Sequence, residues 1–137
     1  MSEILIGYEA SFSKAYNSDD IQRFSIISGD DNPIHIDDGY ASQSVFGQRV
    51  VHGVLLVSMF SKIFGTIYPG NGTIYLSQAS KFLKPAFVGD TITAKVKLLE
   101  FNEQKSLGVF LTECYKINGE LILTGEAKIL FPKSFMS

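Results

Sequence analysis

The sequence predicts an α+β fold in which a curled antiparallel sheet wraps around one long central helix, within a single domain spanning residues 1–137. Two observations lead to this prediction. Residues 51–64 form a helical pattern that is apolar on nearly every side, and the segments that follow alternate between apolar and polar side chains as antiparallel strands do. A helix with so little polar surface must be buried, and a sheet that curls around it can bury it.

The elements expected before the long helix are short. Residues 9–16 alternate weakly and indicate a strand. A short helix should follow, because Asn17 or Ser18 can cap it and acidic residues occupy its first turn. Its expected apolar stripe consists of Ile21, Phe24 and Ile27. The segment 28–33 is rich in turn-forming residues and should end this helix.

Strands are expected after the long helix, which Gly65 should end. Residues 74–82 form the first strand. The side chains expected on one face of it are Ile74, Leu76, Gln78, Ser80 and Phe82. Residues 91–98 alternate clearly, and residues 107–116 and 121–131 should form a hairpin around Asn118-Gly119. Because a single curled sheet would leave part of the helix and one sheet edge uncovered, we expect a homodimer.

Composition narrows the possible partners and the compartment. Hydrophobic residues make up 45% and charged residues 19%, the formal net charge is −2, and the basic residues are scattered. This balance favours a globular protein and gives no reason to expect a nucleic acid or a membrane as a partner. The single cysteine, Cys114, cannot form an internal disulfide, and the first residues lack the pattern of a secretory signal. We therefore expect a cytoplasmic protein.

The segment 28–35 carries the most informative polar residues. Asp30 and His35 lie on either side of a turn that Asn32 and Pro33 stiffen. A rigid turn can hold a carboxylate and an imidazole in a fixed relation, as acid–base catalysis requires. From spacing alone, Asp30 could also be a simple turn former and His35 an ordinary surface or core side chain.

Metal binding is not expected. The segment around Asp30 lacks the alternating oxygen ligands and the sixth-position glycine of a calcium loop. With only two histidines and one cysteine, and no pair of histidines at short helical spacing, the chain does not resemble a zinc protein.

Several blocks of the sequence resemble one known family. Ser28-Gly29-Asp30-x-Asn32-Pro33-Ile34-His35 is similar to the signature of the R-specific enoyl-CoA hydratases, the MaoC-like or hydratase 2 family of the hotdog superfamily. Val50-Val51-His52-Gly53, Gly72-Thr73-Ile74-Tyr75-Leu76, Phe82-Leu83-Lys84-Pro85-x3-Gly89-Asp90 and Leu123-Thr124-Gly125-Glu126-Ala127 resemble later blocks in the same order.

The resemblance implies a hotdog fold, dimer formation and hydration of a trans-2-enoyl-CoA to a (3R)-3-hydroxyacyl-CoA. Asp30 and His35 would flank one water and act as general base and acid. The substrate would be an acyl-CoA thioester, with coenzyme A as part of the substrate and no separate cofactor.

Residues of the long helix supply the remaining candidates. Gly53 lies near its N-terminus, so its backbone N–H could stabilise an oxyanion, or the glycine could simply start or pack the helix. Val57, Phe60, Ser61 and Phe64 are expected on the same face as Gly53, with Ser61 and Phe64 as the substrate-binding candidates. We interpret His52 as a capping or packing residue. The candidates for binding the phosphates of coenzyme A are Arg49, Lys62, Lys81 and Lys84.

Other functions fit the same motif. A dehydratase acting on acyl-carrier-protein substrates would use the same pair in reverse, and a thioesterase would hydrolyse the thioester instead. A non-catalytic acyl-CoA binding module is a further alternative, although such a module would not need an Asp and a His held in one rigid turn.

Overall fold

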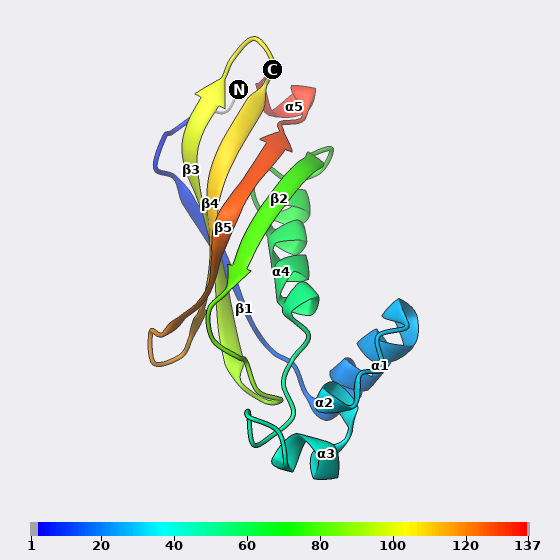
Figure 1. Cartoon of the computed structure of the whole chain (residues 1–137). Helices are drawn as coiled ribbons and strands as arrows, with labels where there is room; N and C mark the ends of the chain where they lie inside the picture. The colour runs from blue at the N-terminus through cyan, green and yellow to red at the C-terminus, as the bar shows by residue number, and fades with distance from the viewer. Residues whose placement is uncertain (1–2, 137) are drawn as a thin grey trace.

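The computed structural model describes residues 3–136 and contains one five-stranded antiparallel sheet with the strand order β1-β3-β4-β5-β2. The elements are β1 (Glu9–Ala15), α1 (Ser18–Ser28), α2 (Pro33–Ile36), α3 (Asp38–Ser42), α4 (Gly53–Thr66), β2 (Ile74–Phe82), β3 (Thr91–Asn102), β4 (Leu107–Lys116), β5 (Leu121–Leu130) and α5 (Lys133–Met136). Figure 1 shows the sheet curling around α4, while α1, α2 and α3 form a separate lobe beyond one end of α4. The predicted α+β arrangement is confirmed.

The core lies between α4 and the concave face of the sheet. The side of α4 that faces the sheet is fully buried through Met59, Phe60, Ile63 and Phe64. The sheet contributes the expected face of β3, where Ile92, Ala94, Val96 and Leu98 are all inaccessible to solvent. Burial of this apolar surface is what holds the helix against the sheet. The helix continues one residue past Gly65, so the prediction that Gly65 ends it was wrong by a residue.

The side chains of β2 do not alternate as predicted. Its pairing with β5 is irregular between Tyr75 and Ser77, and such a bulge moves the following side chains to the opposite face. Tyr75 and Gln78 therefore point inward, whereas Ile74 and Leu76 are exposed. The strict alternation predicted for this strand fails at its start because periodicity in a sequence does not reveal a bulge.

Helix α1 begins as predicted, and its predicted apolar stripe is confirmed at Ile21 but not at Ile27. The Asn17 side chain accepts a hydrogen bond from the Asp20 N–H, and the Asp20 side chain accepts one from the Asn17 N–H, forming a capping box. The buried residues are Ile21 and Ser25, and Ile27 is 85% exposed.

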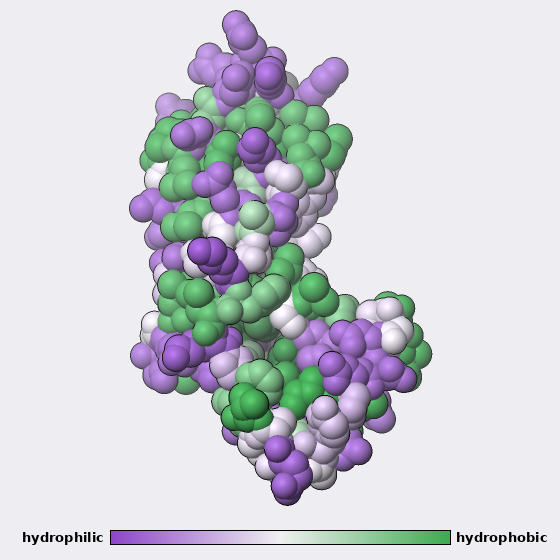
Figure 2. Space-filling model, in the orientation of Figure 1, coloured by the Kyte–Doolittle hydropathy of each residue, from purple (hydrophilic) through white to green (hydrophobic). Residues whose placement is uncertain are grey.

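Apolar surface remains exposed on α4 and on the neighbouring strand. Val54 on the outer face of α4 is 59% exposed, and Leu76 on β2 is 53% exposed. Strand β2 ends the sheet and pairs on one side only. Figure 2 shows apolar side chains over this side of the molecule and around the junction with the lobe. Within residues 3–136, no helix has both the length and the apolar character needed to span a membrane.

Candidate active site

The candidate site is built on the bend between α1 and α2. Gly29 ends α1 in the left-handed conformation, with φ of 79°, which a glycine adopts without strain. The Asp30 N–H then donates to the Ser28 hydroxyl at 3.0 Å. The Asn32 side chain caps α2 by accepting from the Ile34 N–H at 3.2 Å, and Pro33 occupies the first turn. These local bonds fix the path of the chain between the two predicted catalytic residues.

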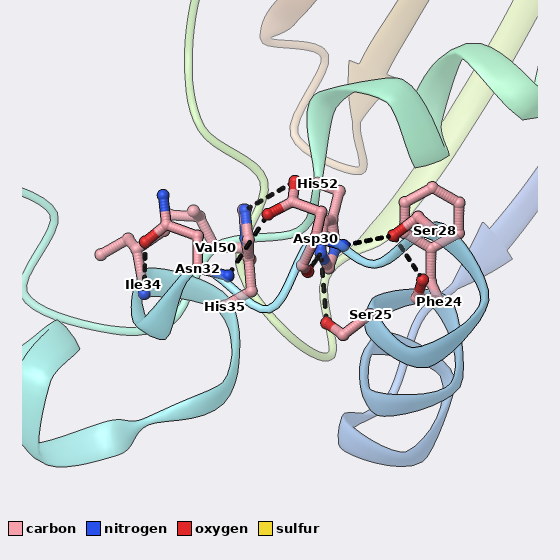
Figure 3. Close-up of polar contacts among 9 residues, drawn as sticks. All are labelled: Phe24, Ser25, Ser28, Asp30, Asn32, Ile34, His35, Val50 and His52. Atoms are coloured by element: carbon pink, nitrogen blue, oxygen red, sulfur yellow. Dashed lines mark hydrogen bonds and ion pairs between the residues drawn. The ribbon is translucent and has the colours of Figure 1, made fainter.

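Asp30 and His35 lie close together. The distance from Asp30 Oδ2 to His35 Nε2 is 4.0 Å, and their side chains are 48% and 12% exposed. A separation of 4.0 Å is too long for a direct hydrogen bond, yet it allows one water to bond to both atoms at ordinary distances of about 2.8 Å. Figure 3 shows these residues where α1 and α2 approach the start of α4.

A backbone carbonyl sets the tautomer of His35. His35 Nδ1 lies 2.8 Å from the carbonyl oxygen of Val50. A carbonyl oxygen only accepts hydrogen bonds, so Nδ1 carries the hydrogen and donates it. In the neutral ring, Nε2 is then left with a free lone pair on the side of Asp30. The pair therefore offers two proton acceptors to a molecule placed between them.

A pocket of about 490 Å³ opens beside this pair. Asp30, His35 and Lys84 are among its polar residues. The rest of its wall is mostly apolar and includes Ile34, Phe46, Val50, Val51, Gly53, Val54, Leu56, Phe82, Leu83, Pro85 and Ala86. Its volume is in the range of small-molecule sites, which typically span roughly 300–1,000 Å³. An apolar cavity with a few converging polar groups can bind an acyl chain and expose one end of it to acid–base chemistry.

Gly53 lines the same pocket and is the first residue of α4. At this position its N–H has no carbonyl one turn earlier in the helix to bond to, and the helix dipole adds positive potential there. The glycine also packs closely, because an added Cβ would lie 2.6 Å from the ring of Phe82, which would then have to move aside. Both interpretations offered by the sequence, a donor site and a packing site, therefore have structural support.

The structure does not bring the other two candidates to this pocket. Ser61 is exposed on the outside of α4, and Phe64 is buried in the core, where its ring packs edge-on against Tyr75 and Phe110. Neither residue lines the pocket of the single chain. The helical turn places Phe64 toward the sheet, while the pocket lies at the other end of α4. Their role in binding substrate stays a prediction.

His52 is the functional candidate that the sequence analysis undervalued. Its side chain makes no capping bond to α4, so the capping alternative was wrong. The packing alternative is confirmed, because His52 is 1% exposed and its ring packs against His35 with a centroid distance of 3.7 Å. Asp30, His35 and His52 together place possible metal-ligand atoms within 4.8 Å of one another. Because the two imidazole rings are stacked with only 21° between their planes, their in-plane lone pairs do not converge on one ion.

The basic candidates have different surroundings. Lys84 lines the pocket. Arg49 is held by the Asp38 carboxylate at 2.7 Å and by the Ser18 hydroxyl at 3.1 Å, so it joins α1 to α3. The Lys62 ammonium lies 4.8 Å from the centre of the Phe12 ring. Lys81 is exposed on β2 and does not line the pocket. Among these four, Lys84 is the one placed to meet a ligand in the pocket.

Comparison with known proteins identifies the family. Residues 5–114 match the family model described as the MaoC like domain. The chain belongs to the MaoC-like family. It is 38% identical over 127 residues to an (R)-specific enoyl-CoA hydratase from Aeromonas caviae, covering 93% of this chain and 95% of the relative. It is 37% identical over 130 residues to an (R)-specific enoyl-CoA hydratase from Rhodospirillum rubrum, covering 95% and 90%.

Solved structures agree with the sequence comparison. The structure of an (R)-hydratase from A. caviae involved in PHA biosynthesis superimposes with a TM-score of 0.93 at 36% identity, covering 96% of this chain and all of the other. The curled five-stranded sheet around α4 is thus the hotdog fold, and the family resemblance seen in the sequence is confirmed.

Proposed function

We propose that this protein catalyses the reversible, (R)-specific hydration of a trans-2-enoyl-CoA to a (3R)-3-hydroxyacyl-CoA. The observation that carries the proposal is the approach of Asp30 Oδ2 to 4.0 Å from His35 Nε2 beside an apolar pocket. Relatives that are 38% and 37% identical over nearly the whole chain are (R)-specific enoyl-CoA hydratases, which supports the same reaction and stereochemistry.

The proposed reaction adds one water across the double bond. The water lies between Asp30 and His35 and donates a hydrogen bond to each, which turns a lone pair of its oxygen toward Cβ. Its oxygen forms the new bond to Cβ, one of its protons passes to the pair, and the double-bond electrons move toward the thioester carbonyl. A proton from the pair then reaches Cα. The new C–O and C–H bonds replace the π bond and one O–H bond of the water, with no net oxidation or reduction, so the proposal includes no separate cofactor.

The negative charge that develops on the thioester oxygen needs a donor. We assign this role to the Gly53 N–H, because Gly53 is the first residue of α4 and lines the pocket. Removal of one such donor typically costs on the order of 10²–10³ in rate. A backbone donor cannot be deleted by a side-chain change, so its contribution is best tested by altering how closely a substrate can approach it.

We further propose that the protein is a homodimer in which β2 and the outer face of α4 meet their counterparts in a second copy. Support comes from the unpaired edge of β2 and from the exposed apolar side chains Val54, Leu76 and Phe82 next to it. Ser61 lies on this exposed face of α4. In the proposal, Ser61 and Phe64 take part in substrate binding only where a second copy extends the pocket along α4.

Two further parts of the proposal concern the substrate and the compartment. Lys84 at the pocket wall is the candidate for meeting a phosphate of coenzyme A. A buried single cysteine, Cys114, is compatible with the reducing cytoplasm, where we place the protein.

The test is a hydration assay with crotonyl-CoA. The proposal predicts that the enoyl absorbance falls without release of free thiol and that the product is (3R)-3-hydroxybutyryl-CoA by chiral analysis. Release of thiol would instead indicate a thioesterase. Turnover of the enoyl chain on acyl-carrier protein but not on coenzyme A would indicate a carrier-protein dehydratase, and binding without turnover of either would contradict an enzymatic role.

A further inference from the structure

His52 lies beneath the Asp30–His35 pair and is almost completely buried, with 1% of its surface exposed. One face of its ring stacks on His35, with a centroid distance of 3.7 Å and an interplanar angle of 21°. The ring of Phe24 from α1 packs against it at 4.8 Å and 71°. The imidazole is thus enclosed between α1 and the ring of His35 (Figure 3).

The hydrogen bonds of His52 determine which nitrogen carries the proton. Nε2 lies 3.1 Å from the backbone carbonyl oxygen of Asp30 and 3.3 Å from the Ser25 hydroxyl. The carbonyl oxygen can only accept, so Nε2 is the protonated nitrogen and donates. Nδ1 is buried and has no hydrogen-bond partner within the described residues 3–136. A proton added at Nδ1 would create a buried N–H without an acceptor.

His52 therefore remains a neutral ring. Burial lowers the pKa of His52, and the neighbouring His35 lowers it further, while the Asp30 carbonyl and carboxylate act in the opposite direction. The titratable groups that face the ring are Asp30 and His35, and α1 presents Ser25 and Phe24. A neutral ring is what the pair requires, because a cation stacked on His35 would oppose the positive charge that His35 gains when it accepts a proton.

His52 contacts both Asp30 and His35. The His52 Nε2–H holds the main chain of Asp30, and the face of the same ring supports the imidazole of His35. The Asp30 side chain is about half exposed, and its Oδ1 accepts a hydrogen bond from the Asn32 N–H at 3.3 Å. Its position relative to His35 also depends on the backbone to which it is attached. The Ser28 hydroxyl holds the N–H of Asp30, and His52 holds its carbonyl group.

We propose that His52 is a positioning residue for the Asp30–His35 pair, acting as a neutral imidazole that donates to the Asp30 carbonyl and supports the His35 ring by stacking. This inference rests on the proposed hydratase function. Misplacement of reacting groups by about 1 Å can cost on the order of 100-fold in rate, so loss of either contact should be visible in turnover.

The first test measures crotonyl-CoA hydration by two complementary variants. His52→Phe keeps a ring for stacking but removes the donor, and His52→Gln keeps a donor but removes the ring. Each should lower kcat by on the order of 10-fold to 100-fold while KM changes by less than about threefold. Ser25→Ala is the matched control, because it removes the other contact of Nε2 and leaves the Asp30 bond and the stack in place; its kcat should match the wild type.

Folded His52→Phe and His52→Gln proteins that retain wild-type kcat would overturn the inference, even if they melt at a lower temperature. A wild-type protein that does not hydrate crotonyl-CoA would instead reject the proposed function. The two failures are therefore distinguishable.

A second test needs no turnover and uses ¹⁵N-labelled histidine in the intact protein. Because the chain has two histidines, His52→Phe assigns both rings. The His52 ring should show the neutral Nε2–H tautomer throughout the range of about pH 7 to 8, and the His35 ring should show the Nδ1–H tautomer when neutral. In His52→Gln, the His35 signals should change in shift and broaden. A His52 ring that becomes imidazolium within this range, or His35 signals that do not respond to either variant, would contradict the positioning role.

Discussion

At the scale of single residues, two backbone carbonyl groups determine where the imidazole protons lie. The Val50 carbonyl accepts from His35 Nδ1 and the Asp30 carbonyl accepts from His52 Nε2. The two histidines are thereby given different tautomers, although their rings are stacked. His35 keeps a free lone pair facing Asp30, and His52 keeps a buried one with no partner among residues 3–136. One ring is suited to exchange protons and the other to remain neutral.

The lowered pKa of His52 has a consequence for stability. A histidine whose pKa is lower in the folded protein than its ordinary value of 6.5 binds protons more readily in the unfolded chain. Its contribution to folding stability is therefore complete above pH 6.5 and declines as the pH falls below that value. We expect the free energy of unfolding from urea titrations to fall below this pH, with a smaller decline in His52→Phe. If the free energy of unfolding fell equally with pH in the wild type and in His52→Phe, this prediction would be contradicted.

Cys114 should be unreactive in the folded protein. Burial raises the pKa of its thiol to about 12 and leaves no surface for a reagent, and only the thiolate is an effective nucleophile. Iodoacetamide at pH 8 should therefore leave the native protein unmodified and label one site after addition of urea, as measured by intact mass. Rapid labelling of the native protein would show that β4 opens readily.

The sequence predicted that Asp30 and His35 lie together, because they belong to one short motif. It did not predict that the fold brings His52 into contact with them. Asp30 and His35 share one turn, so their proximity follows from local geometry. His52 is far from both in the chain, and only the approach of α4 to the bend brings it into contact. A useful signal was present, because a polar residue directly before so apolar a helix must find hydrogen-bond partners when it is buried.

At the scale of elements, close contact between β2 and β5 depends on Gly125. It pairs with Ser80, and an added Cβ would lie 1.8 Å from the Ala79 carbonyl oxygen. Backbone atoms cannot move aside without breaking the pairing of the two strands. Gly125→Ala should therefore destabilise the protein by roughly 3 kcal/mol or more in urea unfolding.

Gly65 provides the matched control. It lies within α4, and an added Cβ there would meet nothing within 4 Å. Gly65→Ala should stabilise the protein by about 0.5 kcal/mol, because alanine loses less entropy than glycine in a helix. Equal effects of the two substitutions would show that the β2–β5 contact is not the reason for glycine at position 125.

Regular elements were more predictable than irregular ones. The alternation over residues 91–98 identified every buried residue on the inner face of β3, because the irregularity in its pairing with β4 comes only after Leu98. In β2, the bulge interrupts the period. The sequence placed Ser61 and Phe64 on one face of the helix, which was expected to line the pocket. In the structure the sheet buries Phe64, and Ser61 is exposed on the outside of α4. The sequence does not show which end of the helix meets the pocket.

At the scale of the whole molecule, the exposed edge of β2 should govern assembly. A lysine at this edge would place a charge against the partner strand and would favour the monomer. Leu76→Lys should therefore lower the mass measured by light scattering at micromolar concentration from that of two chains to that of one. Ile117→Lys is the control, because Ile117 is 86% exposed in the turn between β4 and β5. A wild-type monomer, or an unaffected Leu76→Lys dimer, would contradict the proposed interface.

In the proposed mechanism one water bonds to both Asp30 and His35, so the two side chains should act as a unit. The most direct measurement is kcat/KM for crotonyl-CoA hydration by Asp30→Asn, His35→Ala and the double variant, with circular dichroism to confirm that each is folded. Each single change should lower kcat/KM by on the order of 10²–10⁴, and the double variant should be no slower than the more damaged single variant. Losses that multiply in the double variant, or activity that survives in both single variants, would contradict a shared water.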